Sequence, residues 1–349
     1  MKRLIALFLC LILALSMAAC GNGPETPSHV PEGSSMQVHF IDVGQADAAL
    51  ILCDGQAMLI DGGNAEDSNL RYTYLKKQGI THLDYVIGTH AHEDHIGGIA
   101  GALNYATAGK VFSPATDYDT KAFQSFKKAA QNRGSTLTVP KVGETFSLGS
   151  ANCKTLAVNT EEDTNNTSIV LRITYGETSF LFTGDAEREV EQVLLDSGTT
   201  LKSTVLKVGH HGSDSSTSYA LLRSVAPEYA VISVGKDNSY GHPTEEVLSR
   251  LRDADVKTYR TDLQGDIICT SDGKTVTFTT GKNANTDAFS GIGGNSTQKQ
   301  YVLNLSSKKF HYETCDSAQQ ISEKNRQTYT GTREDLLSQG YSPCGVCKP

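Results

Sequence analysis

The sequence predicts an α/β protein built in layers, with a small additional unit at its C-terminus. Short runs rich in β-branched and aromatic residues alternate with helix-like segments from Gln37 onward. Several of these runs end in His or Asp, as strands do where a layered α/β sheet presents a site along one edge. Near Gly281 the core-forming residues give way to a stretch rich in Gly and Asn, which indicates a boundary.

The bulk composition limits the classes of function. The chain has 349 residues, 38% of them hydrophobic, and a formal net charge of -8. This length is enough to bury a substantial core. The negative charge excludes a general electrostatic attraction to nucleic acid or anionic lipid. An anionic substrate therefore requires local cations, which bound metal ions supply compactly.

Residues 1–20 resemble a bacterial lipoprotein signal. Lys2 and Arg3 precede an apolar run, and "AAC" ends at Cys20, the expected lipidation site. The alternative is an uncleaved membrane anchor, although the run is short of the roughly 20 residues that a span needs. Residues 21–35 are rich in Gly, Pro and Ser and are predicted to form a flexible tether. We expect an extracytoplasmic protein held at the cell membrane by a lipid.

The main unit is predicted to cover residues 36–281. Its first half contains the strand-like runs "QVHFIDVG", "AALILC", "AMLIDGG" and "LDYVIGTH", with a helix over residues 69–77. Its second half contains "SIVLRITYG", "TSFLFTGD", "TVLKVGHHGS" and "YAVISVG", separated by the helix-like "AEREVEQVLLDSG" and "PTEEVLSRLRDAD". Cys53, Cys153 and Cys269 lie in apolar, strand-like surroundings and are predicted to be buried thiols. Residues 282–299 are predicted to link this unit to a second one over residues 300–349.

The segment "GTHAHEDHIGG" combines metal-binding residue types at close spacing. His90, His92, Asp94 and His95 fall within six residues. Imidazole nitrogens and carboxylate oxygens suit zinc, manganese or iron, and the two halves of the motif can face two adjacent ions. Two glycines follow, which let the chain turn into a helix beginning near Ile96. Taken alone, the motif has the alternative interpretation of an exposed polar loop.

Further donors follow later strands. "FTGDAE" places Asp185 after an apolar strand, where its carboxylate could bridge two ions. "LKVGHHGS" places His210 and His211 after another strand, and "YGHP" adds His242. These separate donors at strand ends strengthen the prediction of a metal site.

Seven segments in order resemble the metallo-β-lactamase superfamily, and more narrowly the hydrolase-like domain of ComEC-type competence DNA-uptake channels. They are "FIDVGQADA", "LIDGG", "THAHEDHIGG", "NNTSIVL", "FTGD", "LKVGHHGS" and "SVGKDNSYGHP". The resemblance implies an αββα sandwich with a metal site along one edge. It implies a supporting role for Asp61 and metal-ligand roles for His90, His92, Asp94, His95, Asp185 and His210.

The resemblance also leaves alternatives. His210 is preferred as the last ligand because it directly follows the strand and a glycine. His211 and Ser213 then become candidates for phosphate contacts or proton transfer, although His211 has the alternative of a structural hydrogen bond in the loop. Gln45 and Asp47 are candidates with turn chemistry as their alternative, and Ala46 stands where close relatives carry glycine.

One departure from the superfamily pattern concerns a missing histidine. The wider superfamily uses a further histidine before the bridging aspartate, but this chain has none between His95 and His210. "NNTS" occupies that interval and supplies Asn165, Asn166 and Ser168 as candidate substrate contacts. One metal position is therefore expected to be weaker, completed by water, or suited to manganese as well as zinc.

The expected reaction is hydrolysis by metal-activated water. Two divalent ions, zinc or manganese, would be held in the site, and the catalytic candidates are Asp94, His211 and His242. The ComEC resemblance favours a phosphodiester, with DNA as the first expected substrate. The alternatives are a phosphorylcholine ester, a lactone or a β-lactam, or a non-catalytic lipoprotein that binds nucleic acid. No protein partner is evident.

The C-terminal unit contains a second donor set, HxxxC followed by CxxC. His311, Cys315, Cys344 and Cys347 match a closed tetrahedral zinc site, and a unit this small needs such a metal. The alternative is a disulfide in an oxidising exterior. The unit resembles the metal-binding domain of the Ada DNA-repair protein, with His311 at the methyl-accepting cysteine position. Because imidazole lacks the activated thiolate, we expect a structural zinc without methyl transfer.

Overall fold

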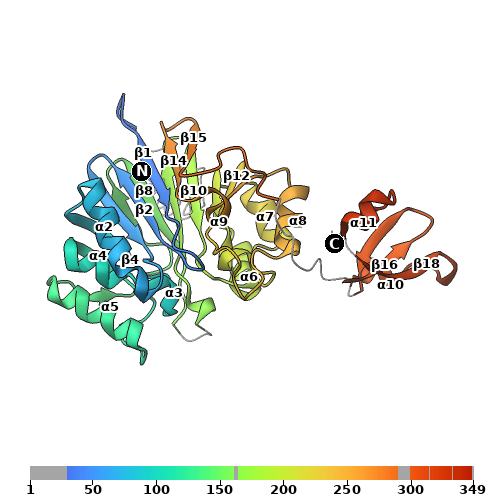
Figure 1. The fold of residues 1–349 in the computed structure, drawn as a ribbon, viewed down its shortest axis with the longest axis horizontal. Helices are drawn as coiled ribbons and strands as arrows, with labels where there is room; N and C mark the ends of the chain where they lie inside the picture. The colour runs from blue at the N-terminus through green and yellow to red at the C-terminus, as the bar shows by residue number, and fades with distance from the viewer. Residues whose placement is uncertain (1–29, 161–163, 290–298, 314, 332, 348–349) are drawn as a thin grey trace, which may run out of the picture.

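Two β-sheets packed face to face form the centre of the main unit, and helices cover both outer faces (Figure 1). The computed structural model describes residues 30–160, 164–289, 299–313, 315–331 and 333–347. The predicted signal segment 1–20, Cys20 and residues 21–29 lie outside the described residues. Within the described part of the chain, no helix has the length and apolar character needed to cross a membrane. The layers match the αββα sandwich that the sequence predicts.

The first sheet has eight strands, which carry the N-terminal half of the unit and its last hairpin. In spatial order they are β15 (Val276–Thr280), β14 (Ile267–Ser271), β1 (Met36–Phe40), β2 (Ala49–Cys53), β3 (Gln56–Ile60), β4 (His82–Ile87), β5 (Thr107–Phe112) and β6 (Leu137–Thr138). Strands β3 to β6 pair in parallel, whereas the others pair antiparallel.

The second sheet has seven strands. In spatial order they are β13 (Lys257–Arg260), β12 (Tyr229–Ile232), β11 (Val205–Lys207), β10 (Thr178–Phe182), β9 (Val170–Tyr175), β8 (Ala151–Ala157) and β7 (Thr145–Leu148). Strands β10 to β13 pair in parallel. The carboxyl ends of parallel neighbours meet at one sheet edge, so the residues after β3, β4, β10 and β11 come together there.

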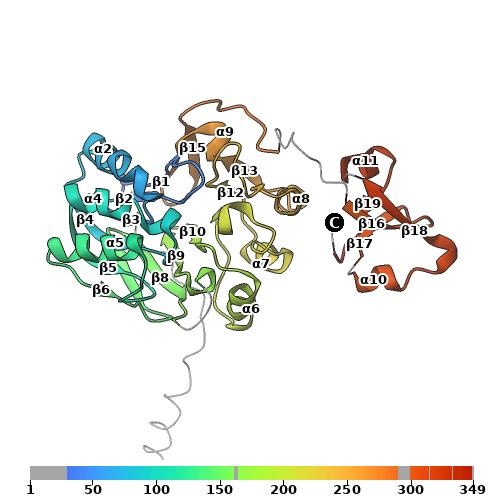
Figure 2. The same ribbon diagram turned by 60° about the horizontal axis from the view of Figure 1, so that its bottom comes forward.

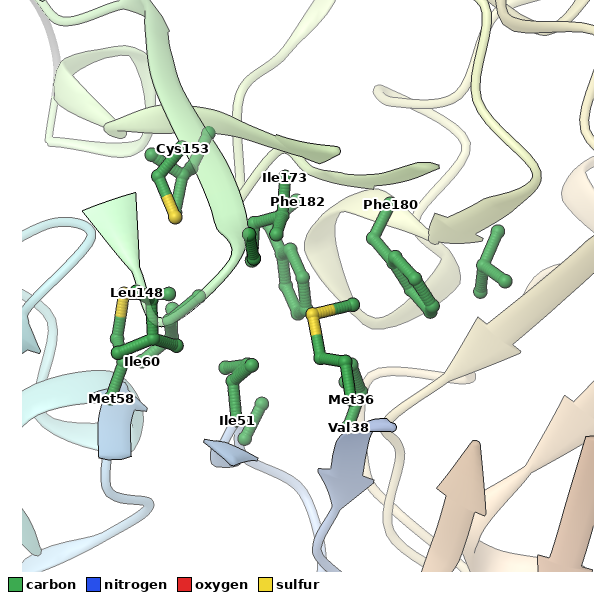
Figure 3. Packing of buried hydrophobic residues seen from close by; sticks show 14 of the residues in the cluster. Met36, Val38, Ile51, Met58, Ile60, Leu148, Cys153, Ile173, Phe180 and Phe182 are labelled. Atoms are coloured by element: carbon green, nitrogen blue, oxygen red, sulfur yellow. The ribbon is translucent and has the colours of Figure 1, made fainter. Parts of the chain in front are cut away.

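Alternating apolar residues build three core layers. Met36 and Val38 of β1 point between the sheets toward Phe180 and Phe182 of β10 (Figure 3). Because side chains alternate along a strand, Leu50 of β2 packs instead on the opposite face of the first sheet, against the helices that cover it. The predicted buried thiols Cys53, Cys153 and Cys269 are all buried and free.

Helices complete the sandwich on each side, as the two views agree (Figures 1 and 2). The first sheet is covered by α2 (Ser68–Gln78), α3 (Glu93–Ile96), α4 (Ile99–Tyr105) and α5 (Lys121–Asn132). The second is covered by α6 (Arg188–Asp196), α7 (Tyr219–Val225) and α8 (Glu245–Asp253), and α9 (Thr261–Gln264) follows β13. Short 3-10 turns occur at Ala65–Asp67, Asn165–Thr167, Gly209–Gly212 and Glu323–Asn325.

After β15, the last strand of the main unit, the chain remains packed against that unit for several residues. Ala288 is buried, and its carbonyl accepts a hydrogen bond from Arg260 Nη1 at 3.0 Å. Phe289 packs against the core beneath α6 to α8. Folded structure therefore continues past Gly281, and the next strand starts at Lys299.

The C-terminal unit is a four-stranded sheet with two short helices. Its spatial order is β18 (Arg326–Gly331), β16 (Lys299–Asn304), β17 (Lys309–Tyr312) and β19 (Ser342–Pro343), with α10 (Asp316–Gln319) and α11 (Arg333–Ser338) beside it. Tyr301, Leu303 and Phe310 form a small core with Leu336 and Tyr341. Arg333 Nη2 lies 2.8 Å from Oδ1 of Asp253, which ties the unit to the end of α8.

Candidate metal centre

The HxHxDH motif begins in the loop after β4, at the carboxyl end of a central strand, and its Asp94 and His95 lie in α3. His90 and His95 are fully buried, whereas the Asp94 side chain is 33% exposed. The predicted helix near Ile96 is divided into two: α3 ends at Ile96, and α4 begins at Ile99. A Cβ atom added at Gly98 would lie 2.0 Å from the Gly62 carbonyl oxygen, so the two glycines permit a close approach of two backbone segments.

Asp61 fixes the orientation of this loop from the end of β3. Its Oδ1 accepts the backbone N–H of Thr89 at 2.8 Å, and its Oδ2 accepts the Thr89 hydroxyl at 2.8 Å. Oδ2 also lies 2.8 Å from Nδ1 of His95. Because Nδ1 of His95 is engaged there, its Nε2 is directed toward the centre of the site, as in carboxylate-supported metal ligands.

Asp185 forms the meeting point of the donors. Its Oδ2 lies 3.2 Å from Nε2 of His95 and 3.8 Å from Nε2 of His90. The Nε2 atoms of His210 and His211 each lie 3.7 Å from the same oxygen. Residues separated by more than a hundred positions therefore converge on one buried carboxylate.

The remaining two donors of the motif lie beside the histidines that surround this carboxylate. Nδ1 of His92 is 3.0 Å from Nε2 of His90. Oδ2 of Asp94 is 3.9 Å from Nε2 of His95 and 3.2 Å from Nε2 of His211. All six residues predicted as metal ligands, together with His211, thus belong to one cluster.

The "NNTS" segment supports Asp185 from behind. Ser168 is fully buried, and its Oγ accepts the backbone N–H of Asp185 at 3.0 Å. Asn166 Oδ1 accepts the N–H of Glu187 at 3.0 Å, and Asn165 Nδ2 donates to Glu187 Oε1 at 3.3 Å. These three side chains therefore hold the Asp185 loop, a role that their position in the sequence did not indicate.

The outer residues His242 and Ser213 border the cluster. The His242 ring centroid lies 5.7 Å from that of His210. Burial and the nearby His210 and His211 together lower the pKa of His242 to about 4. Ser213 is buried, and its Oγ lies 3.0 Å from the Ser215 hydroxyl. Of the candidates before β2, Gln45 Oε1 accepts the Gly235 N–H at 3.0 Å.

Asp47 pairs with a lysine that sequence reasoning missed. Lys207 Nζ lies 2.8 Å from Asp47 Oδ1 and 2.9 Å from Oδ2, and both side chains are buried. Oδ1 of Asp47 is 4.0 Å from Nδ1 of His211. Lys207 is the last residue of the otherwise apolar strand β11. The alternation of apolar residues in this segment does not predict a buried charge.

The donor atoms fit divalent metal ions. Within the described residues, Nε2 of His95, Nε2 of His211 and Oδ1 of Asp185 are buried without a hydrogen bond of acceptable geometry. The donors of His90, His95 and Asp185 lie within 4.8 Å of one another, as do those of Asp94, His95 and His211. Imidazole nitrogens and carboxylate oxygens at such spacing match the ligand preferences of zinc and manganese.

Burial and charge act differently on the several donors. Burial, together with the charge of neighbouring His95, lowers the pKa of His90 well below its usual value. Burial also opposes the charged forms of His95 and His211, but Asp185 and the other nearby carboxylates outweigh it and raise the pKa of both rings, so a bound cation must displace their protons. Burial opposes ionisation of Asp185, yet the positive charges of His95 and His211 outweigh it and hold the pKa of Asp185 well below its usual value. A neutral imidazole beside an ionised carboxylate is the form that binds a cation.

A second cluster lies in the C-terminal unit. The donor atoms of His311, Cys315, Cys344 and Cys347 lie within 4.8 Å of one another. Cys315 Sγ is 3.7 Å from Nδ1 of His311, and the Cys344 N–H donates to the Phe310 carbonyl at 2.9 Å. The described cysteines form no disulfide. One imidazole and three thiols at this spacing fit a tetrahedral zinc ion.

Comparisons with known proteins agree with this geometry. A family model described as the metallo-beta-lactamase superfamily matches residues 41–236. ComE operon protein 3 of Bacillus subtilis is 30% identical over 67% of this chain and 33% of its own length. Competence protein ComA of Neisseria gonorrhoeae is 32% identical over 68% of this chain and 33% of its own.

A third relative extends the same group. Recombination protein 2 of Haemophilus influenzae is 33% identical over 62% of this chain and 26% of its own length. The chain therefore spans only about a third of the first two relatives, or less in the third. The family match covers more than half of the chain and includes the HxHxDH loop, Asp185 and the His210–His211 pair. This protein belongs to the metallo-β-lactamase superfamily of metal-dependent hydrolases and is related to the competence proteins.

Proposed function

We propose that this protein is a metal-dependent phosphodiesterase that cleaves DNA outside the cytoplasm, where a lipid on Cys20 attaches it to the membrane. The observation that carries the proposal is the convergence of four imidazoles on one oxygen of Asp185. The names of the relatives, which refer to competence and recombination, favour DNA over other phosphodiesters.

The proposed layout follows the boundaries expected from the sequence. A signal peptide (1–20) and a tether (21–35) precede the hydrolase unit (36–281), and the expected linker (282–299), which stays packed on that unit as far as Phe289, leads to the zinc-binding unit (300–349). The tether would let the hydrolase reach substrate near the membrane surface.

The proposed metal ligands are His90, His92, Asp94, His95, Asp185 and His210. Two divalent ions bound there supply a water nucleophile near neutral pH and compensate charge on the phosphate. Asp61 holds the His95 imidazole through Nδ1 and thereby keeps Nε2 turned inward. Asp94 combines a position in the cluster with partial exposure, so its carboxylate can orient the attacking water from the open side.

His242 is the proposed contact to the substrate phosphate. Its low pKa, about 4, keeps the imidazole neutral at pH 7. Its Nδ1 is buried without a hydrogen-bond partner in the described structure, so the ring has a donor or acceptor available. A neutral donor beside the ions could stabilise the charge that develops on a non-bridging oxygen.

The reaction can be tested on the chain without residues 1–20. We expect it to cleave DNA and bis(p-nitrophenyl) phosphate with added zinc or manganese, and to leave a lactone and a β-lactam intact. Asp94→Ala and Asp185→Ala should each abolish cleavage. Asp84→Ala is the matched control. Oδ2 of Asp84 accepts the backbone N–H of Ala57 on the same sheet, away from the cluster.

Each outcome separates the alternatives. Turnover of only the lactone or the β-lactam would replace the phosphodiester proposal with another ester. Metal binding without turnover of any substrate would favour a binding protein. Membrane attachment has a separate test: Cys20→Ala should move the full-length protein from the detergent phase to the aqueous phase in Triton X-114 partitioning.

A further inference from the structure

We propose that the adjacent residues His210 and His211 ligate different ions. His211 completes the set formed by Asp94 and His95. His210 completes the set formed by His90 and His92, and so replaces the histidine that the chain lacks between positions 95 and 210. This inference rests on the two-ion site proposed above but not on its substrate.

The backbone of the pair is arranged to separate the two rings. His210 has φ 51° and ψ 45°, and His211 has φ 54° and ψ 19°, so two successive non-glycine residues occupy the left-handed region. That conformation is unfavourable for a residue with a Cβ atom and persists only where the surrounding structure enforces it. The loop is held by the His210 N–H, which donates to the Gly184 carbonyl at 3.1 Å. The ring centroids end 6.2 Å apart.

His211 has the orientation of a metal ligand. Its Nδ1 donates to the Ser233 carbonyl at 3.1 Å, which directs Nε2 toward Asp94 Oδ2 at 3.2 Å. The side chain is 3% exposed, and Nε2 makes no hydrogen bond of acceptable geometry among the described residues. A ring fixed through one nitrogen, with the other pointing at a carboxylate cluster, is the usual arrangement of a histidine ligand.

His210 repeats this arrangement beside the same oxygen of Asp185. Its Nδ1 lies 3.2 Å from the Ser215 hydroxyl and 3.4 Å from Glu187 Oε1. Its Nε2 lies 3.7 Å from Asp185 Oδ2, the same separation as for His211. Glu187 therefore supports His210 in the way that Asp61 supports His95, and both rings direct Nε2 inward.

The "NNTS" side chains provide no free nitrogen donor. Ser168 Oγ is buried behind Asp185 and accepts its backbone N–H. The amide nitrogens of Asn165 and Asn166 donate to Glu187 and to Glu189 on α6, whereas Asn165 Oδ1 is buried without a hydrogen bond among the described residues. The His210 imidazole is then the available nitrogen donor that shares Asp185 Oδ2 with His90. Each ion would then have three ligands of its own and share Asp185.

Metal binding by single and paired variants tests the assignment. Asparagine is the chosen replacement, because it tolerates the left-handed backbone better than alanine. The metal content of His210→Asn and of His211→Asn is measured after equilibrium dialysis against zinc, with affinity measured by chelator competition. Each variant should keep the C-terminal zinc and one site ion. The lost ion should bind weaker by more than the roughly 10–100-fold that loss of an outer partner causes.

Paired variants identify which ion is lost. Adding His92→Ala to His210→Asn should remove no further ion, whereas adding Asp94→Ala should remove the second one. His211→Asn should behave in the opposite way with these two partners. His82→Asn is the control, because His82 is exposed and lies at the start of β4. Circular dichroism of each metal-free variant checks that it folds.

Specific results would overturn the inference. Two tightly bound site ions in His210→Asn would exclude His210 as a ligand. Loss of the His92 ion in His242→Asn, with His210→Asn unaffected, would assign that position to His242. Because the readout is metal content, the ligand pattern can hold even if the chain cleaves no phosphodiester, and it can fail while the phosphodiesterase activity is present.

Discussion

Lys207 Nζ lies 2.8 Å from Oδ1 of Asp47, and this buried ion pair joins the two sheets beneath the metal cluster. The partners are 160 residues apart in the chain, with Lys207 on β11 and Asp47 in the loop before β2. The backbone N–H of Asp47 donates to the Asp94 carbonyl at 3.1 Å, so the pair also supports the HxHxDH loop. Burial raises the pKa of Asp47, but the positive charge of Lys207 and of nearby histidines outweighs it and lowers the pKa overall.

Lys207→Met should destabilise the protein by about 3–5 kcal/mol, because it leaves the Asp47 charge buried without its partner. The double variant Asp47→Asn with Lys207→Met should be more stable than Lys207→Met alone, since no unpaired charge remains. Urea unfolding of the single and double variants measures both effects. Lys127→Met is the matched control: Lys127 lies 2.8 Å from Asp117 on the surface, and its loss should cost less than about 1 kcal/mol. Equal losses for the two lysines would contradict this prediction.

Asp61→Asn should weaken metal binding at the main site by roughly 10–100-fold. The amide oxygen can still accept the Thr89 N–H, but the amide nitrogen cannot accept a hydrogen bond from His95 Nδ1. The His95 ring then loses its fixed orientation. Competition with a chromophoric chelator measures the affinity. Asp84→Asn, which changes an aspartate whose Oδ2 accepts the Ala57 N–H, should bind metal as the wild type does. Unchanged affinity in Asp61→Asn would show that the Asp61 contact does not orient the ligand.

Local patterns in the sequence were sufficient to predict most of the main unit. The run "AALILC" became β2, "TSFLFTGD" became β10, and the segment 69–77 lies within α2. The run "QVHFIDVG" forms β1, and its alternation turns Met36 and Val38 into the core between the sheets. The residues that the family resemblance names as donors lie together in the structure, and strand-end His and Asp residues are recognisable without knowledge of the sheet order. The αββα sandwich is confirmed.

The supporting contacts of the site were not predictable from the same patterns. Lys207 reads as part of an apolar strand, and its partner is far away in the chain. The Ser233 carbonyl that orients His211 is a backbone group, which carries no sequence signal. The division of one expected helix into α3 and α4 depends on the approach of Gly98 to Gly62. Each of these features is set by tertiary packing between distant segments rather than by local propensity.

Arg250→Met should destabilise the loop that follows the histidine pair. The buried guanidinium of Arg250 on α8 donates through Nη1 to the carbonyls of Ser216 at 2.9 Å and Thr217 at 3.2 Å. Its removal leaves buried carbonyls unpaired, at a cost of about 1–3 kcal/mol each. We expect lower stability by urea unfolding and weaker metal binding in the same variant.

Arg252→Met is the control for this prediction. Arg252 lies on the same helix and is 32% exposed, and its Nη1 lies 3.2 Å from Glu245 Oε1. Loss of this surface pair should cost less than about 1 kcal/mol and leave metal binding unchanged. If Arg252→Met lowered metal affinity as much as Arg250→Met, the effect would belong to α8 as a whole and not to the contacts of Arg250.

Zinc in the C-terminal unit should protect three thiols from alkylation. With His311, Cys315, Cys344 and Cys347 around one ion, iodoacetamide should modify these cysteines only after a chelator removes the metal. Cys344→Ser should lose the zinc, as measured by native mass spectrometry. His311→Cys should retain it, because four thiolates also form a closed tetrahedral site. Cys269→Ser changes a buried thiol on β14 and should leave zinc content unaltered. A mass two hydrogens lower that reverts on reduction, without bound zinc, would instead indicate a disulfide at this position.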